Sequence, residues 1–150
     1  MTPDLIAGID PGLSNGTVIE FTVIGRPVPQ GSMRAFRHKV TGAVVSTSDN
    51  KRTKPWKQEV AQTAMSLGCG MFDRDTPVEI TMNFYFTRPK SANKRKGMTV
   101  KPDGDKLVRS IFDAITGVLI VDDAQIVEHH ARKHYGGPER CEIRIQEAIC

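Results

Sequence analysis

The sequence predicts an α+β fold: a single domain in which a mixed β-sheet is combined with two main helices. Strand-like and helix-like runs follow one another along the chain, and neither an internal repeat nor a linker divides it. The 150 residues match the length of one ordinary domain, and 39% are hydrophobic, enough for a core. There is no apolar run near the roughly 18 residues of a membrane span and no signal-peptide pattern, so we expect a cytoplasmic protein without a membrane anchor.

The expected strands differ in how clearly their pattern shows. In Val78–Phe86 apolar and polar residues alternate, which is the clearest period of two in the chain. Residues 18–24 are rich in β-branched side chains, and residues 34–46 predict a hairpin around Thr41 and Gly42. Two further strands are expected at residues 125–135 and 141–145.

Two segments have helical periodicity. The first helix begins near Pro55 and ends at Gly68, with one apolar face formed by Trp56, Val60, Ala64 and Leu67. The second covers about residues 105–116 and ends at Gly117. Its buried stripe is expected to consist of Leu107, Val108, Ile111, Phe112 and Ile115. Residues 88–100, between these segments, form a basic loop without apolar periodicity, which we expect to be mobile.

Charge is distributed unevenly. The formal net charge is only +4, but residues 26–57 hold eight Lys or Arg and one acid, and residues 88–101 hold six and none. Residues 103–128 hold six acids and two bases. Cations that follow a phosphate backbone around a metal-binding carboxylate cluster are typical of nucleases.

Four aspartates carry the proposed chemistry: Asp103, Asp105, Asp122 and Asp123. Taken singly, each is explained better by helix capping or a turn. Taken together, two pairs flank one helix, and residues 118–121 are expected to run back along that helix so that Asp123 meets Asp103 and Asp105. Carboxylates gathered at one point need a cation, and hard oxygen ligands favour Mg²⁺ or Mn²⁺.

Arg109 is expected among these carboxylates, because Asp105, Arg109 and Asp113 follow one another at intervals of four on a helix. Such a series can be a surface salt-bridge ladder of little energy. Beside a metal site, the same guanidinium can clamp the scissile phosphate.

In these segments the chain resembles the RusA family of Holliday junction resolvases. The resemblance is carried by Asp103-Gly104-Asp105-Lys106, Asp113-Ala114-Ile115-Thr116-Gly117, Asp122-Asp123-Ala124-Gln125-Ile126, Lys133 and the upstream residues 24–30. It extends over about residues 19–146, so residues 19–150 are expected to form a RusA-like domain. Residues 1–18 are then an N-terminal extension.

The resemblance implies a homodimeric, Mg²⁺-dependent endonuclease, bacterial or phage-encoded, that makes paired nicks across a four-way DNA junction in recombination and repair. It implies that Asp103, Asp105 and Asp123 are catalytic. Two positions depart from the family pattern: Lys106 replaces an Asn, and Arg109 stands where a catalytic Lys is expected. Because Arg does not readily give up a proton, electrostatic stabilisation survives this change better than general-acid chemistry does.

Two other functions stay open. The departures at Lys106 and Arg109 allow a DNA-binding protein of the same fold that does not cleave. Residues 8–14 resemble the first strand of RNase H-like resolvases, in which Asp10 would bind metal, but the later carboxylates and the C-terminal helix of that fold are missing.

Seven basic residues are the expected DNA contacts: Arg34, Arg37, Lys90, Lys94, Arg95, Lys96 and Lys133. Lys133 is expected far from the active site, because ten strand residues separate it from Asp123 by roughly 33 Å. Only 6% of residues are aromatic, so recognition through shape and backbone fits better than stacking on single strands. A dimer would match the two-fold symmetry of a four-way junction.

Overall fold

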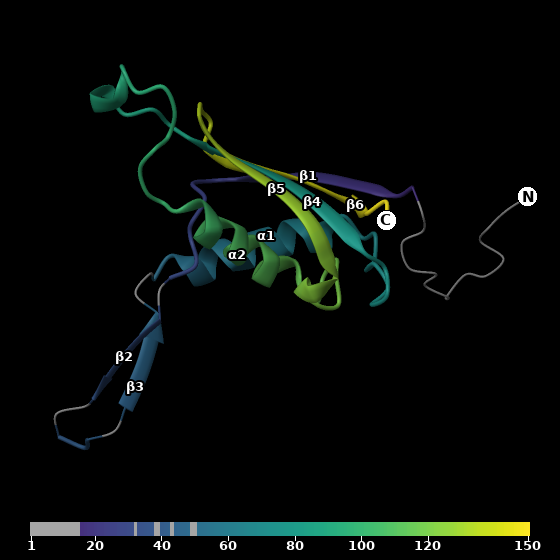
Figure 1. Ribbon diagram of the computed structural model, residues 1–150, viewed down its shortest axis with the longest axis horizontal. Helices are drawn as coiled ribbons and strands as arrows, with labels where there is room; N and C mark the ends of the chain where they lie inside the picture. Colours follow the sequence, from purple (N-terminus) through teal and green to yellow (C-terminus); the bar gives the residue numbers. More distant parts are fainter. Residues whose placement is uncertain (1–15, 32, 38–39, 43, 49–50) are drawn as a thin grey trace, which may run out of the picture.

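The computed structural model describes residues 16–31, 33–37, 40–42, 44–48 and 51–150 (Figure 1). Four strands form the main sheet: β1 (Val18–Ile24), β4 (Val78–Phe86), β5 (Ile126–Tyr135) and β6 (Arg140–Glu147). Two short strands form a hairpin: β2 (Met33–Arg37) and β3 (Val44–Ser48). The helices are α1 (Thr53–Ser66) and α2 (Gly104–Ile115), with 3₁₀ turns η2 (Lys90–Ala92) and η3 (Asp123–Gln125).

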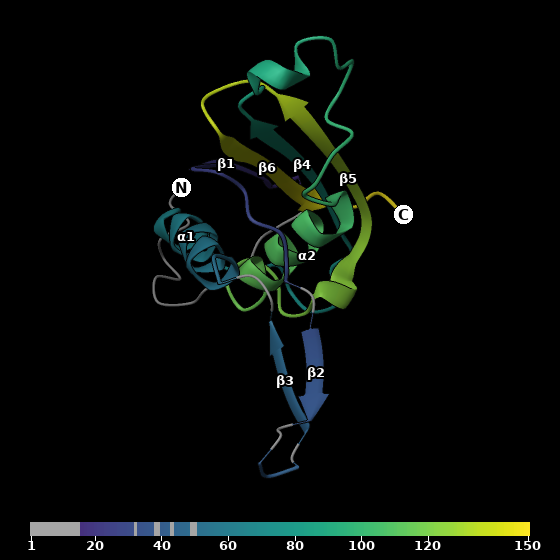
Figure 2. The ribbon, with the colours of Figure 1, turned by 90° about the vertical axis from the view of Figure 1, so that its left-hand side faces the viewer.

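The main sheet is mixed and has the strand order β1-β6-β4-β5. β6 pairs antiparallel with both β1 and β4, whereas β5 pairs parallel with β4. Both helices pack on the same face of this sheet, and the β2–β3 hairpin projects away from it (Figures 1 and 2). The α+β prediction is therefore confirmed. The N-terminal extension up to residue 15, including Asp10, lies outside the described residues.

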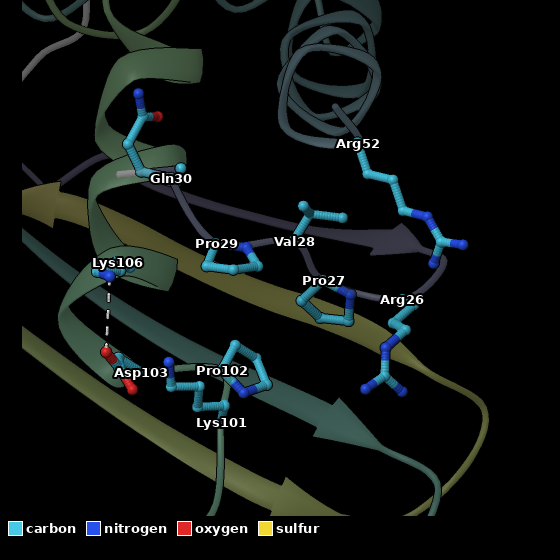
Figure 3. A pocket seen from close by; sticks show the side chains of 11 residues that line it. Arg26, Pro27, Val28, Pro29, Gln30, Arg52, Lys101, Pro102, Asp103 and Lys106 are labelled. Carbon is cyan, nitrogen blue, oxygen red and sulfur yellow. Dashed lines mark ion pairs between the residues drawn. The ribbon is translucent and has the colours of Figure 1, made fainter. Parts of the chain in front are cut away.

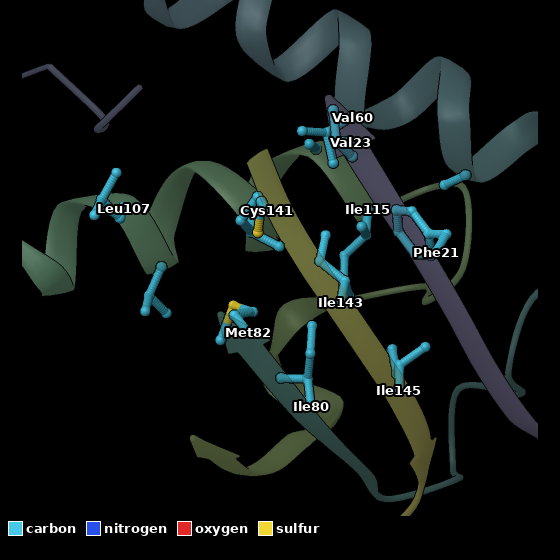
Figure 4. Close-up of a cluster of buried hydrophobic side chains, with 14 of the residues drawn as sticks. Phe21, Val23, Val60, Ile80, Met82, Leu107, Ile115, Cys141, Ile143 and Ile145 are labelled. Atoms are coloured by element: carbon cyan, nitrogen blue, oxygen red, sulfur yellow. The ribbon is translucent and has the colours of Figure 1, made fainter. Parts of the chain in front are cut away.

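The core lies between the sheet and the two helices. Alternate residues of β4 point into it, as their period of two predicted, and the inner residues of β6 lie beside them in register. The side chains that meet there include Phe21, Val23, Val60, Ile80, Met82, Leu107, Ile115, Cys141, Ile143 and Ile145 (Figure 4). Each large apolar side chain buried in this way stabilises the fold by about 1.5 to 3 kcal/mol.

The helical faces were predicted well with two exceptions, Phe112 of α2, which is only partly buried, and Leu67 after α1. The buried residues of α1 include Trp56, Val60 and Ala64, but Leu67 is 41% exposed, so its assignment to the buried face is wrong. The helix ends at Ser66, and Leu67 lies at its cap rather than one turn further along the face. Burial instead continues at Phe72, whose backbone N–H donates to the carbonyl of Leu119 at 2.8 Å.

The opposite face of the sheet carries polar side chains. The Arg140 guanidinium lies 3.8 Å from the centroid of the Tyr85 ring, which stacks on His134 at 4.6 Å. His134 Nε2 lies 2.7 Å from Asn83 Oδ1. Partial burial, followed by the charge of Arg132, lowers the pKa of His134.

Within the described residues, the structure contains no helix that is both long and apolar enough to cross a membrane.

Candidate active site

An extended segment, residues 26–31, connects the beginnings of both helices. The carbonyl of Val28 accepts a hydrogen bond from the buried Ser110 hydroxyl at 2.9 Å, and the carbonyl of Pro29 accepts one from Thr53 at 2.8 Å. The Gln30 N–H donates to the Lys106 carbonyl at 2.8 Å. Because Pro27 and Pro29 have no N–H, this segment suits hydrogen bonding through its carbonyls. These bonds fix it across α1 and α2.

The surface of this segment forms one wall of a pocket of about 430 Å³ (Figure 3). The side chains drawn around it are Arg26, Pro27, Val28, Pro29, Gln30, Arg52, Lys101, Pro102, Asp103 and Lys106. Four are cationic and one is anionic, so the lining favours an anionic ligand. Sequence reasoning placed the cations of residues 26–57 and 88–101 on DNA but did not single out Arg26, Arg52 or Lys101, and it noted Lys106 only as a departure from the family pattern. The proline-rich segment at residues 26–30 was the available signal.

Asp103 and Asp105 lie where α2 begins. Asp103 is the N-cap residue, and its carboxylate pairs with Lys106 at 3.8 Å. Asp105 pairs with Arg109 at 3.1 Å, and the hydrogen bond from that guanidinium lowers the pKa of Asp105. Both carboxylates therefore lie at the start of α2, where the sequence placed them, and each is paired with a cation of the same helix.

Lys133 lies beside this pair, so the prediction that it lies far from the active site is wrong. Its ammonium donates to the carbonyls of Val100 and Pro102 at 2.8 and 3.0 Å, immediately before Asp103. The prediction considered only the distance along the strand from Asp123 to Lys133. It did not consider the distance from Lys133 to Asp103, which belongs to another segment. Because β5 runs antiparallel to α2, it brings Lys133 to the beginning of that helix. Between these ends, the rings of Phe112 and His129 meet edge to face at 5.4 Å.

Asp122 and Asp123 lie beyond the other end of α2. The Asp122 carboxylate accepts from the Ala124 N–H at 2.9 Å, which lowers the pKa of Asp122. The Gln125 side chain accepts from the N–H groups of Val121 and Asp122, completing a capping box around η3. This hydrogen bonding fixes the Asp122 carboxylate and the backbone of η3 at the start of β5.

The charge around Asp123 is negative. Partial desolvation, then a hydrogen bond with Asp122 and the charges of Asp122 and Asp113, raise the pKa of Asp123. A cation close to these groups would relieve the repulsion between them. Asp113 itself pairs with Lys57 at 3.6 Å, so the ion pairs along this face are Asp105 with Arg109 and Asp113 with Lys57.

The expected return of the chain along α2 is made by β5 and not by residues 118–121. Those residues form a tight turn in which the N–H groups of Val118 and Leu119 donate to the Ile115 carbonyl. Asp123 consequently starts the return instead of finishing it. It lies beyond the end of α2 and not beside Asp103 and Asp105, so the expectation that these three carboxylates meet within one chain is wrong. Within the part of the chain that the structure describes, no three His, Cys, Asp or Glu side chains are close enough together to hold a metal ion. The metal-ligand assignment of the four aspartates stays a prediction.

The other predicted DNA contacts lie in the loop at residues 88–100 and on the projecting hairpin. Lys90, Lys94 and Lys96 are exposed in the loop at residues 88–100. Arg95 is half-buried and donates to the Tyr135 hydroxyl at 2.5 Å. Arg34 and Arg37 belong to β2, opposite Thr47 and Val44 in register, on the projecting hairpin.

The loop at residues 88–100 has an internal framework that its sequence did not predict. Arg88 donates to the carbonyls of Ala92 and Arg95 at 2.6 and 2.7 Å, and its guanidinium lies 4.4 Å from the centroid of the Tyr135 ring. Ala92 and Met98 are buried. Arginine thus satisfies backbone carbonyls here, a role that composition alone does not distinguish from a DNA contact.

An α+β domain that sets a carboxylate pair beside a cation-lined pocket has the features of a protein that acts on nucleic acid. Comparison with known families gives the same class: residues 25–146 match the family model described as "Endodeoxyribonuclease RusA". The chain belongs to the RusA family. It is also 31% identical over 140 residues to "Uncharacterized protein YqaN" of Bacillus subtilis (strain 168), covering 86% of this chain and 96% of that protein.

Proposed function

We propose that this protein is a Mg²⁺-dependent, structure-specific endodeoxyribonuclease that resolves four-way DNA junctions by paired nicks in recombination and repair. The observation that carries the proposal is the Asp103 and Asp105 pair at the start of α2, beside a cation-lined pocket, in a chain of the RusA family. Carboxylates alone would repel a phosphodiester, so the adjacent cations are needed to bring the DNA backbone to them.

The donor set fits a hard divalent cation. Mg²⁺ is commonly bound by one or two carboxylates together with substrate phosphate oxygens and water, and Mn²⁺ accepts the same ligands. Asp103 and Asp105 would supply these carboxylates at the start of α2. Asp122 and Asp123 lie beyond the other end of that helix, so within one chain they form a separate acidic pair and would not hold the same ion. When bound, the metal lowers the pKa of a bound water and stabilises charge on the phosphoryl group under attack.

The residues of the chain hold and orient the DNA strand. Arg109, paired with Asp105 at 3.1 Å, sits one helical turn from the start of α2 and can exchange that carboxylate for a phosphate oxygen. Its charge is permanent, so its contribution is electrostatic and proton transfer does not pass through it. Lys133 holds the carbonyls before Asp103 and so orients the carboxylate pair.

We further propose that the protein acts as a homodimer. A four-way junction has two symmetry-related cleavage positions, and a two-fold dimer presents one active site to each. Sedimentation equilibrium should give twice the chain mass of 16.6 kDa. A species of one chain mass that still makes paired nicks would contradict this part of the proposal.

The decisive experiment uses a labelled synthetic four-way junction with and without Mg²⁺. Symmetric nicks that disappear in EDTA support the proposal, whereas binding without nicks supports a non-cleaving DNA-binding protein. Asp103→Asn should lower the cleavage rate by about a hundredfold or more and leave junction affinity equal or higher, because it removes negative charge near phosphate. Glu20→Gln, the same change on the outer face of β1, is the matched control and should cleave normally.

A further inference from the structure

The pocket beside Asp103 has a shape and a lining that its role as a charged surface does not explain. Its volume of about 430 Å³ lies in the range of sites that enclose small ligands of about 300 to 1,000 Å³. The pocket is open to solvent along one side, and its volume is sufficient for a single nucleotide. Pro27, Val28 and Pro29 line the floor of the pocket between its charged groups; Pro27 and Val28 are buried, so the exposed apolar surface comes mainly from the half-buried Pro29.

The charged groups stand at opposite ends of this floor. Arg26 and Arg52 lie at one end, and Asp103, Lys101 and Lys106 at the other, with the proline-rich segment between them (Figure 3). A strand whose scissile phosphate is at Asp103 would therefore reach the two guanidinium groups with a neighbouring phosphate. The sugar and base between these phosphates would lie over the prolines and Val28.

The floor is built before any ligand arrives. Ser110, Thr53 and the Gln30 N–H hold residues 28–30 through the hydrogen bonds described above, and Thr53 and Ser110 are themselves buried. A preorganised site avoids the entropic cost of ordering on binding. Guanidinium planes also stack on nucleobases. The Arg26 guanidinium pairs with Glu139 at 2.7 Å and lies 5.1 Å from the centroid of the Phe86 ring, so it would exchange Glu139 for the phosphate of a bound nucleotide.

We propose that this pocket captures one nucleotide of the junction, unstacked from its helix, directly next to the scissile phosphate. Unstacking is least costly where a base has already lost its neighbours, which is the situation at the crossover of a four-way junction. The pocket would thereby make cleavage depend on branched structure. This inference rests on the proposed function, and the tests below separate the two.

Fluorescence detects the capture directly. Nucleotides at the crossover of a synthetic junction are replaced one at a time by 2-aminopurine, whose emission rises on unstacking, and the protein is added in EDTA so that the strands stay intact. One position should brighten severalfold with the wild-type protein. The double variant Arg26→Ala with Arg52→Gln should abolish that signal at saturating protein. Arg144→Ala, which removes a cation from the outer sheet face, is the matched control and should retain it.

Cleavage kinetics test whether the captured nucleotide acts through the pocket. An abasic nucleotide at the bright position should lower kcat/KM of the wild type about tenfold, the size expected for loss of one stacked base. The double variant should have a lower kcat/KM than the wild type on the intact junction. The abasic nucleotide should lower its kcat/KM by less than a further twofold, because its pocket no longer binds the base. Circular dichroism should show both variants folded, as expected for replacements of exposed residues.

Three outcomes would overturn the pocket proposal: no crossover position brightens, the abasic change slows wild type and double variant equally, or Arg144→Ala loses the signal as well. A fourth outcome would also overturn the pocket proposal: replacing the phosphate at the bright position by a neutral methylphosphonate weakens binding, whereas the abasic change there has no effect. The pocket would then bind the phosphate backbone and not the base. A protein that brightens one position but never cuts in Mg²⁺ would refute the endonuclease and leave the pocket standing.

Discussion

Lys133 shows how one side chain changes role when the tertiary contacts are known. A basic residue on an exposed edge strand suggests a DNA contact, yet its ammonium is held by the carbonyls of Val100 and Pro102. Those carbonyls belong to the chain that leads directly into Asp103. Lys133 is therefore a positioning residue, and its loss should impair cleavage more than binding.

Lys133→Met keeps the apolar stem and removes the two charge-assisted hydrogen bonds. We expect the free energy of unfolding to fall by about 1 to 3 kcal/mol and the cleavage rate to fall at least tenfold, with little change in junction affinity. Lys94→Met, the same change at an exposed predicted contact, should do the opposite: normal cleavage at saturation, weaker binding, and a salt dependence reduced by about one phosphate contact. Binding isotherms at several salt concentrations and single-turnover rates check both.

The comparison fails if Lys133→Met reduces the slope of log affinity against log salt as much as Lys94→Met does. Lys133 would then contact phosphate, as the sequence alone suggested. Rescue of cleavage by Lys133→Arg, which can still donate to two carbonyls, would support the positioning role.

His134 gives a prediction about pH. Because burial and Arg132 lower its pKa in the folded state, the unfolded chain binds more protons between that lowered pKa and about 6.5, the usual value for histidine. This histidine therefore contributes a loss of stability as pH falls through about 6.5. Urea unfolding at pH 7.5 and 5.5 should show a smaller drop for His134→Gln than for the wild type. An equal drop in both proteins would contradict the assignment.

Among the elements, α2 connects the core to the site. Its inner face buries Leu107, Ile111 and Ile115, and its first turn carries Asp103 and Asp105. Ser110, fully buried, bonds the carbonyls of Val28 and Leu107 and so ties residues 26–31 to the helix. Loss of these hydrogen bonds should therefore affect the pocket as well as the stability of the fold.

Ser110→Ala should lower the free energy of unfolding by about 1 to 3 kcal/mol, because it leaves the buried Val28 carbonyl without this partner. Thr116→Ala removes a comparable hydroxyl bond, to the Phe112 carbonyl at 2.7 Å, from the exposed end of the same helix. Its cost should stay below about 0.5 kcal/mol, since water replaces the bond. Equal losses in urea titrations of the two variants would show that the Ser110 tie contributes nothing beyond an ordinary surface bond.

At the scale of the whole molecule, residues 1–15 precede the domain formed by the sheet and the helices. The sheet begins at Val18 of β1, which pairs along its length with β6, and the family match covers residues 25–146. Deleting residues 1–15 should therefore leave thermal stability and junction cleavage within about twofold of the intact chain. Loss of metal-dependent cleavage in a folded deletion variant would favour the RNase H-like hypothesis based on Asp10.

Sequence patterns were sufficient for most of the elements because those elements depend on local periodicity. The alternation in Val78–Phe86 and the apolar stripe of α2 each reflect burial of one face, which the structure has in the same places. The burial of Leu67 was misjudged because this residue is the C-cap of α1, just before the predicted stop at Gly68, and exposure at a helix end is decided by packing rather than by period.

The sequence by itself determined the fold class, the D-x-D pair at the start of a helix and the family, because each is written in residue type and short-range spacing. Only the tertiary structure decided that β5 runs antiparallel to α2, bringing Lys133 to Asp103 and leaving Asp123 beyond the far end. It also gathered Arg26, Arg52 and Lys101 around one pocket. These are contacts between segments up to 75 residues apart, and such contacts depend on how the sheet and helices pack, which no local pattern records.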